Sequence, residues 1–220
     1  ARRQERDGGE PVAVQAQAGL AFVQGAPVGQ TAGAWEYGWG DVDENGRTRF
    51  NRLPFFGKDR WSGSADMPDA ALQWVMWTRG GGHTGADRAH GAILRWTAPE
   101  SGRIDYRGEL KRPSEAGDGV QATLVSSLRG VIGSWEVPPK GGVRIAADGI
   151  DVAEGEALDV VVDCRETDNS DSFQFAPRIV QTGSGQLLAS ADDEFAGPAL
   201  DPWVAYAQVL LVSNELMFVD

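Results

Sequence analysis

The sequence predicts an all-β protein, an antiparallel jelly-roll-type β-sandwich followed by a C-terminal α-helix. Residues 103–111 alternate strictly between charged and apolar or small side chains, the period of a strand with one face on a core and one in water. Short apolar segments recur at intervals of about ten residues between Gly, Pro and Asp-Gly turns, as in sandwiches. The apolar period becomes helical only near the C-terminus, after residue 200.

Four regions follow from these changes in pattern, and 220 residues suffice for one ordinary domain with appendages. The start of the chain is rich in Gly, Ala and Gln and has few large apolar groups. We therefore expect a lead-in segment at 1–34, a β-sandwich binding module at 35–181, a linker at 182–200 and a docking helix at 201–220.

The first half of the sandwich contains three predicted elements. A strand begins at Trp35, with Trp35, Tyr37 and Trp39 on one face. Residues 72–77 are apolar at almost every position and predict a strand covered on both sides. Residues 79–85 are rich in glycine and predict a flexible loop at the rim of the sandwich.

The second half gives clearer strand patterns. Ile104, Tyr106, Gly108 and Leu110 share the core face of the central strand. In the strand at 157–164, Cys164 falls on the apolar side, so we expect it to be a buried small hydrophobe and not a reactive thiol. Further strands are expected at 92–98, 131–137, 142–145 and 173–180.

The C-terminal helix is predicted from its start signals and its apolar stripe. Asp201 is a good N-cap and Pro202 suits the first helical position. A helix of roughly 15 residues is marginal alone in water, so its apolar face must dock on some other surface. The stripe comprises Trp203, Ala207, Leu210, Leu211 and Met217.

The net charge of −12 argues against a nucleic-acid partner, because phosphates are bound by neutralising them with Lys and Arg. No apolar run approaches the roughly 20 residues of a membrane span.

Several motifs match known binding sites only in part. Residues 80–85 match the dinucleotide fingerprint in form, but no helix can follow before the next strand, so nucleotide binding is not expected. His83, Asp87 and His90 could bind a metal, although a solvated or turn-stabilising role is simpler. Asp168 and Asp171 supply the oxygen ligands that calcium uses but lack EF-hand spacing. No catalytic motif is present.

The tryptophans are the strongest functional signal. An indole face can pack against the C–H face of a sugar ring, with polar groups nearby for its hydroxyls. We expect Trp74 and Trp96 to lie in the core because their strands are apolar. The predicted ligand-binding residues are Trp35, Tyr37, Trp39, Trp61, Trp77 and His83, with Trp135, and Trp74 in spite of its apolar strand, as further candidates.

Three clusters of short motifs together resemble a known family. They are residues 35–38; residues 81–85, 93–99 and 117–120; and residues 160–164, 170–173 and 176–179. In this order they are similar to a carbohydrate-binding-module-like β-sandwich of multidomain planctomycete proteins with cytochrome-c-type domains. Residues 208–220 also look like the C-terminal end of the helical domain of those proteins.

The resemblance implies a binding role outside the cytoplasm, as part of a larger protein. It implies no cofactor in this chain: any haem would lie elsewhere in the parent protein, because one cysteine cannot form Cys-x-x-Cys-His. The expected function is thus a non-catalytic carbohydrate-binding module whose partners are a glycan and neighbouring domains. The alternatives are a structural or protein–protein interaction domain and, less favoured, a glycoside hydrolase.

Overall fold

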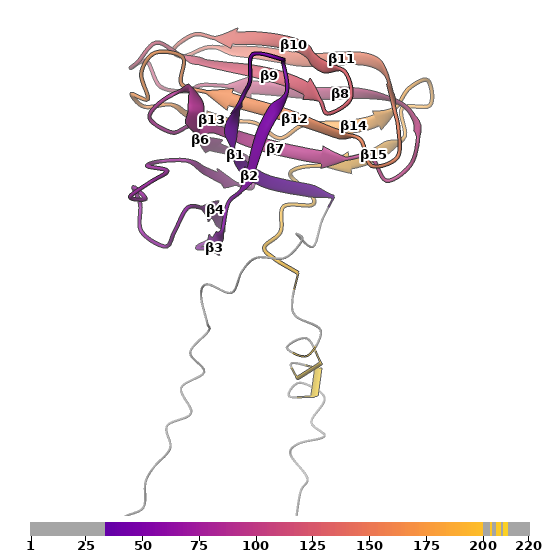
Figure 1. Ribbon diagram of the computed structural model, residues 1–220, viewed down its shortest axis with the longest axis horizontal. Helices are drawn as coiled ribbons and strands as arrows, with labels where there is room; N and C mark the ends of the chain where they lie inside the picture. The colour runs from indigo at the N-terminus through magenta and orange to yellow at the C-terminus, as the bar shows by residue number, and fades with distance from the viewer. Residues whose placement is uncertain (1–33, 200–202, 204–205, 208, 211–220) are drawn as a thin grey trace, which may run out of the picture.

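The computed structural model describes residues 34–199 together with Trp203, Tyr206, Ala207, Val209 and Leu210 (Figure 1). The expected lead-in at 1–34, except Ala34, and most of the expected helix at 201–220 lie outside the described residues. That helix is therefore not shown. Within the described part of the chain, no helix has the length and hydrophobicity to cross a bilayer.

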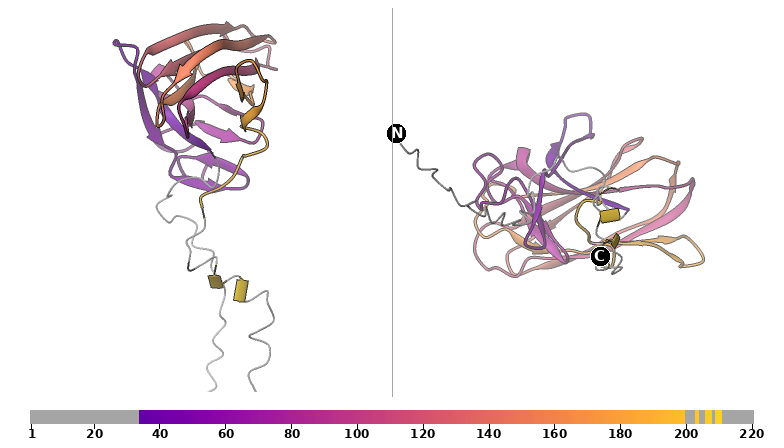
Figure 2. Two further views of the ribbon diagram at one scale, coloured as in Figure 1. Left: turned by 90° about the vertical axis from the view of Figure 1, so that its right-hand side faces the viewer. Right: turned by 90° about the horizontal axis from the view of Figure 1, so that it is seen from below.

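The described residues form two antiparallel sheets that face one another as curved layers (Figures 1 and 2). The six-stranded sheet has the order β10-β9-β12-β7-β1-β2. Its strands are β1 (Trp35–Val42), β2 (Thr48–Arg52), β7 (Gly91–Thr97), β9 (Val120–Ser126), β10 (Gly130–Val137) and β12 (Ala157–Asp163).

The nine-stranded sheet has the order β15-β14-β8-β13-β6-β5-β4-β3, with β11 paired to β8. Its strands are β3 (Phe55–Gly57), β4 (Arg60–Ser62), β5 (Met76–Thr78), β6 (Gly81–His83), β8 (Gly102–Lys111), β11 (Gly142–Val152), β13 (Ser172–Gln174), β14 (Arg178–Gln181) and β15 (Leu187–Ser190). A 3₁₀ helix, η1 (Arg88–His90), precedes β7. The prediction of an all-β antiparallel protein is confirmed.

One core fills the space between the sheets, and alternation along the strands determines which residues enter it. In β8, Ile104, Tyr106 and Leu110 are buried, whereas the charged residues between them point outward, as predicted. Both faces of β12 are covered, including Asp159, which a bidentate ion pair with Arg95 satisfies at 2.7 and 2.8 Å. Cys164 is buried, as predicted, and burial raises its pKa to about 12.

Two predictions for residues 72–85 are wrong. Residues 72–75 form a turn, and only Met76–Thr78 become strand β5, because Gln73 adopts a left-handed backbone with φ of 55°. The glycine-rich segment is not a rim loop: Gly81–His83 form β6, which pairs with β5 and β13 inside the sheet. Glycine is needed there because the neighbouring backbone is close.

We predict that Gly81→Ala destabilises the sandwich. A Cβ at this position would lie 2.0 Å from the carbonyl oxygen of Phe173, and backbone atoms can only separate if β6 and β13 move apart. Overpacking of this kind costs about 1–3 kcal/mol. The free energy of unfolding in urea measures it, with Gly80→Ala as the control because a Cβ there meets nothing within 4 Å. Equal stability of the two variants would contradict the prediction.

The predicted linker at 182–200 is also partly wrong. Residues 187–190 form β15, which pairs with β14, and Ala189, Ala191 and Phe195 are buried in the common core. The small side chains at 189–191 suit an edge position against β14, and Phe195 packs edge-on against Tyr37 at 5.2 Å. The sandwich therefore extends past residue 181.

Candidate functional site

Four of the predicted ligand-binding residues are in the core, which corrects that prediction. Trp35, Tyr37, Trp61 and Trp77 are each at most 4% exposed. Tyr37 stacks on Trp61 with ring centroids 5.8 Å apart, which joins the two sheets. Inward-facing aromatic positions of opposite sheets meet in this way, so these rings have no face left for a sugar.

Trp39 is half-buried in the middle of β1. Its ring stacks on His90 with centroids 5.4 Å apart and an angle of 10°. The Nδ1 atom of His90 lies 2.7 Å from Oδ1 of Asp87, so the carboxylate sets the orientation of the imidazole. His90 therefore has the turn-stabilising role that the sequence suggested as its simpler reading. Trp135 is also half-buried and packs against the core.

Trp74, which we expected in the core, is instead the most exposed tryptophan of residues 34–199, at 41%. The turn before it causes this. Asp69 and Gln73 exchange two backbone hydrogen bonds, and Oδ1 of Asp69 accepts from the N–H groups of Ala71 and Leu72. The hydrogen bonds to the carboxylate of Asp69, that from Leu72 first, lower the pKa of Asp69. The turn places Leu72 in the core and leaves Trp74 facing solvent.

His83 lies beside Trp74, with ring centroids 6.2 Å apart. Burial lowers the pKa of His83, although a hydrogen bond to Thr84 and the charge of Asp168 act in the opposite direction. The imidazole is thus neutral at pH 7. Its Nδ1 lies 2.6 Å from the carbonyl oxygen of Thr84 and must carry the proton, because a carbonyl only accepts. The Nε2 atom is therefore an acceptor, suited to a hydroxyl group.

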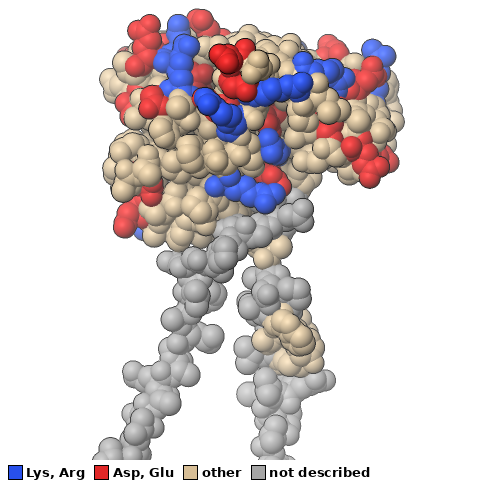
Figure 3. Space-filling view, in the orientation of Figure 1, with Lys and Arg blue, Asp and Glu red and all other residues tan. Residues whose placement is uncertain are grey.

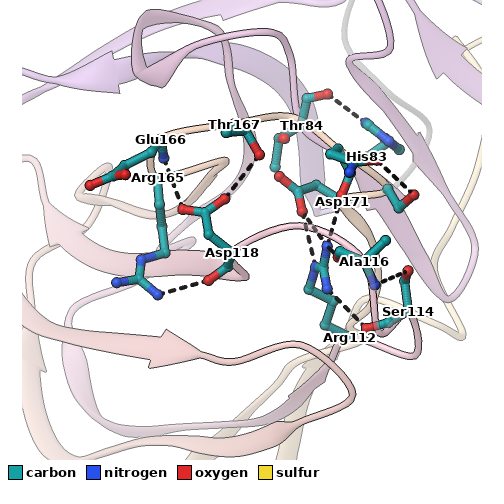
Figure 4. A network of polar contacts seen from close by, with 12 residues as sticks. His83, Thr84, Arg112, Ser114, Ala116, Asp118, Arg165, Glu166, Thr167 and Asp171 are labelled. Atoms are coloured by element: carbon teal, nitrogen blue, oxygen red, sulfur yellow. Dashed lines mark hydrogen bonds and ion pairs between the residues drawn. The ribbon is translucent and has the colours of Figure 1, made fainter.

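The acidic loop at 163–171 is held next to His83 by Arg112 (Figure 4). The guanidinium and Asp171 are both fully buried, and two nitrogens of Arg112 donate to Oδ1 of Asp171 at 2.8 and 3.0 Å. Arg112 also donates to the carbonyl oxygens of Ser114, Ala116 and Asn169. One side chain thereby joins the loop after β8 to the loop before β13.

A second set of bonds joins the same loops. Asp118 accepts from the N–H of Glu166 and the hydroxyl of Thr167, both at 3.1 Å, and its carbonyl oxygen accepts from Arg165 at 2.9 Å. Asp171, one of the two calcium candidates, is already paired with Arg112. In the part of the chain that the structure describes, no three His, Cys, Asp or Glu residues are arranged to hold a metal.

An open groove of about 480 Å³ lies beyond Arg112 on the nine-stranded sheet. Charged side chains line part of it, and ion pairs join Lys111 to Glu109 and Lys140 to Glu115 near it. Its walls are Glu109, Lys111, Arg112, Pro113, Lys140, Gly141, Gly142 and Gln174. Positive and negative side chains are interspersed on the face of the molecule shown in Figure 3.

Sequence reasoning identified only His83 and Asp168 of the residues around Trp74. Trp74 was one of the aromatic candidates but was expected in the core; its exposure could have been inferred from Asp69, whose side chain is of the type that closes a turn. Arg112 gave no signal, because its partners at 169–171 are distant in sequence.

We predict that acidification weakens the fold through His83. Because its pKa is lowered in the folded protein, the unfolded chain binds its proton first as the pH falls. The stabilisation is fully present above the ordinary pKa of 6.5 and is lost as the pH falls below it. Melting temperatures between about pH 8 and about pH 5 should therefore fall more steeply for the native protein than for His83→Gln. Parallel profiles would contradict this.

Two antiparallel sheets closed over one core, with loops gathered at one end, define the chain as a β-sandwich protein. No family model matches the sequence, and no curated protein matches it. Solved structures similar to parts of the chain include two family 35 carbohydrate-binding modules. One, from Clostridium thermocellum, has 14% identity over 42% of this chain and 72% of that chain, with a TM-score of 0.28.

The other, Xyl-CBM35 in complex with a glucuronic acid containing disaccharide, has 17% identity over 68% of this chain and 92% of that chain, with a TM-score of 0.29. The PA14 domain of the MpAFP antifreeze protein has 11% identity over 51% of this chain, with a TM-score of 0.29. The chain covers 55% of the length of that PA14-domain chain, which is about half.

Proposed function

We propose that this chain is a non-catalytic carbohydrate-binding module, one domain of a larger extracytoplasmic protein of the cytochrome-c-associated multidomain type. The observation that carries the binding role is the exposed Trp74 beside a neutral histidine and a loop rich in polar groups. The parent protein and its location are supported by the resemblance of the sequence motifs.

The chemistry of recognition follows from this arrangement. The indole of Trp74 offers an apolar face to the C–H groups of a sugar ring. The Nε2 of His83 accepts from a hydroxyl, and the carboxylate of Asp168, close enough to act on the charge of His83, accepts from another. Few atoms are engaged and binding costs entropy, so one module should bind weakly and act through multivalency in the parent protein.

Two carboxylates near this site have the opposed pKa shifts that acid–base catalysis uses, but their contacts favour a structural role. Burial raises the pKa of Asp163; for Asp118, burial is outweighed by the hydrogen bonds from Glu166 and Thr167, so its pKa is lowered. Asp163 accepts from the N–H of Arg165 at 2.9 Å, and Asp118 accepts from that of Glu166. Both therefore hold the same turn, and we assign neither to catalysis.

Affinity electrophoresis against a panel of soluble polysaccharides tests the proposal. We expect at least one of xylan, mixed-linkage β-glucan, mannan, pectin or laminarin to retard the protein, and excess soluble glycan to reverse this. Unchanged mobility on every gel, together with no signal on a glycan array at about millimolar sugar, the affinity limit expected for so few contacts, would contradict it.

One observation favours the second candidate, a domain that positions its neighbours. Leu187 and Leu188 are 50% and 41% exposed on β15, the edge strand of the nine-stranded sheet. A bulge between the paired residues of β14 and β15 places two consecutive leucines outward. If this is the principal function, substitution of both by lysine should impair assembly of the parent protein while glycan gels show no retardation.

A further inference from the structure

The outer face of the nine-stranded sheet connects His83 to the groove beyond Arg112. The strand register shows this directly: Met76, His83 and Ser172 lie side by side on β5, β6 and β13. The next outward row contains Thr78, Gly81, Gln174 and Lys111, on β5, β6, β13 and β8. Residues paired in this way project from the same face of the sheet.

The row of residues between these two rows shows whether their shared face points to the core or to solvent. Trp77, Gly82 and Phe173 are paired with one another and buried, and Trp77 packs edge-on against Phe173 at 5.2 Å. Since side chains alternate along a strand, the rows on either side of this one face outward. Ser172 and Gln174 are exposed accordingly, whereas His83, at 7% exposed, and Gly81 are largely covered on this face.

The outward row ends inside the groove. Gln174 and Lys111 belong to the row and also line the groove, and Gly142, paired with Lys111, lies beside them. Gly81 has no side chain to obstruct the path, and a Cβ there is excluded by Phe173. Along the track from Trp74 to the groove, the exposed polar side chains of this face are therefore those of Ser172, Gln174 and Lys111.

The length of the track exceeds one sugar ring. From β6 to β11 it crosses three strand-to-strand spacings, about 14 Å in total, and Trp74 lies further out at the other end. Exposed hydrogen-bonding groups along it are the hydroxyl of Ser172, the amide of Gln174 and the ammonium of Lys111, and Nε2 of the largely covered His83 lies at its end.

We infer that the binding surface is this whole track, from Trp74 and His83 across Ser172 and Gln174 into the groove, and that its ligand is a stretch of several sugars in a glycan chain. The inference rests on the proposed carbohydrate-binding function and specifies its substrate class. Trp74 holds one sugar by stacking, and Gln174 contacts only ligands long enough to reach the groove.

Calorimetry with a length series tests this. The probes are fragments of one to six sugars prepared from whichever polysaccharide retards the intact chain on the gels. Affinity should rise at least about tenfold from one sugar to four, since each added hydrogen bond contributes about a three- to tenfold gain. Gln174→Ala should weaken binding of the longest fragment about three- to tenfold and leave the shortest unchanged.

Gln186→Ala, in the turn before β15 and away from the track, is the matched control and should bind every fragment as the native protein does. Equal affinities for one and four sugars would overturn the extended track while leaving carbohydrate binding in place. If Gln174→Ala weakens the binding of fragments of every length equally, the extended track is also overturned, and carbohydrate binding again remains in place. If no polysaccharide retards the protein at all, the proposed function fails and the track fails with it.

Discussion

Replacement of Trp74 by alanine is expected to lower affinity for the retained glycan by at least about tenfold, to below detection on the gels. The indole is the apolar platform of the site, and alanine offers almost no surface to a sugar ring. The ring is 41% exposed and its main aromatic neighbour is His83, so the sandwich should still fold. Affinity electrophoresis measures the loss, and circular dichroism checks the fold.

Trp203→Ala is the matched control, because Trp203 is also a tryptophan with an exposed ring, at 78%, but lies outside the sandwich. It should retain native affinity. If Trp74→Ala binds as well as the native protein, or if both variants lose binding to the same extent, Trp74 is not the platform and the site must be sought elsewhere.

Arg112→Met is expected to cost about 3–5 kcal/mol of folding stability, the largest effect among the loop residues. The variant leaves the carboxylate of Asp171 buried and unpaired, and removes donors from the carbonyl oxygens of Ser114, Ala116 and Asn169. Burial already raises the pKa of Asp171 to about 6 in spite of Arg112. Without Arg112, little else would stabilise the negative charge of this carboxylate. The melting temperature should fall by roughly 6–20 °C.

Two further variants define the cause. Arg178→Met removes an exposed arginine of the same sheet and should change stability by less than about 0.5 kcal/mol. The double variant Arg112→Met, Asp171→Leu leaves no unpaired charge and should be more stable than Arg112→Met alone. If the double variant loses as much stability as Arg112→Met and Asp171→Leu lose together as single variants, the ion pair does not explain the effect of Arg112→Met.

The sequence predicted several strands of the sandwich. In β8, alternation gave the strand position; a strand was also expected at 131–137, where β10 lies, and the pattern at 157–164 indicated that Cys164 would be buried. Prediction failed where a single backbone conformation overrides the side-chain pattern. Gln73, with its positive φ, interrupts the apolar run at 72–77 near its start, and Trp74 in the turn that follows faces outward. The close backbone of Phe173 makes a strand of Gly81–His83.

The candidate site shows the same division. Tryptophan content and a charge of −12 suggested a glycan-binding protein rather than a nucleic-acid partner. They did not indicate which rings are exposed, because a tryptophan on an apolar strand face looks the same in sequence whether or not an opposite sheet covers it. Trp61 is covered by Tyr37, which lies 24 residues before it on the other sheet.

By itself the sequence determined an all-β antiparallel architecture and an inert cysteine, since both depend on local alternation of apolar and polar side chains. Only the tertiary structure decided that Trp74 is exposed, that His83 lies beside it and that Arg112 joins two loops. The physical reason is that burial and ion pairing depend on contacts between residues distant in the chain, such as Arg112 and Asp171, which no local period encodes.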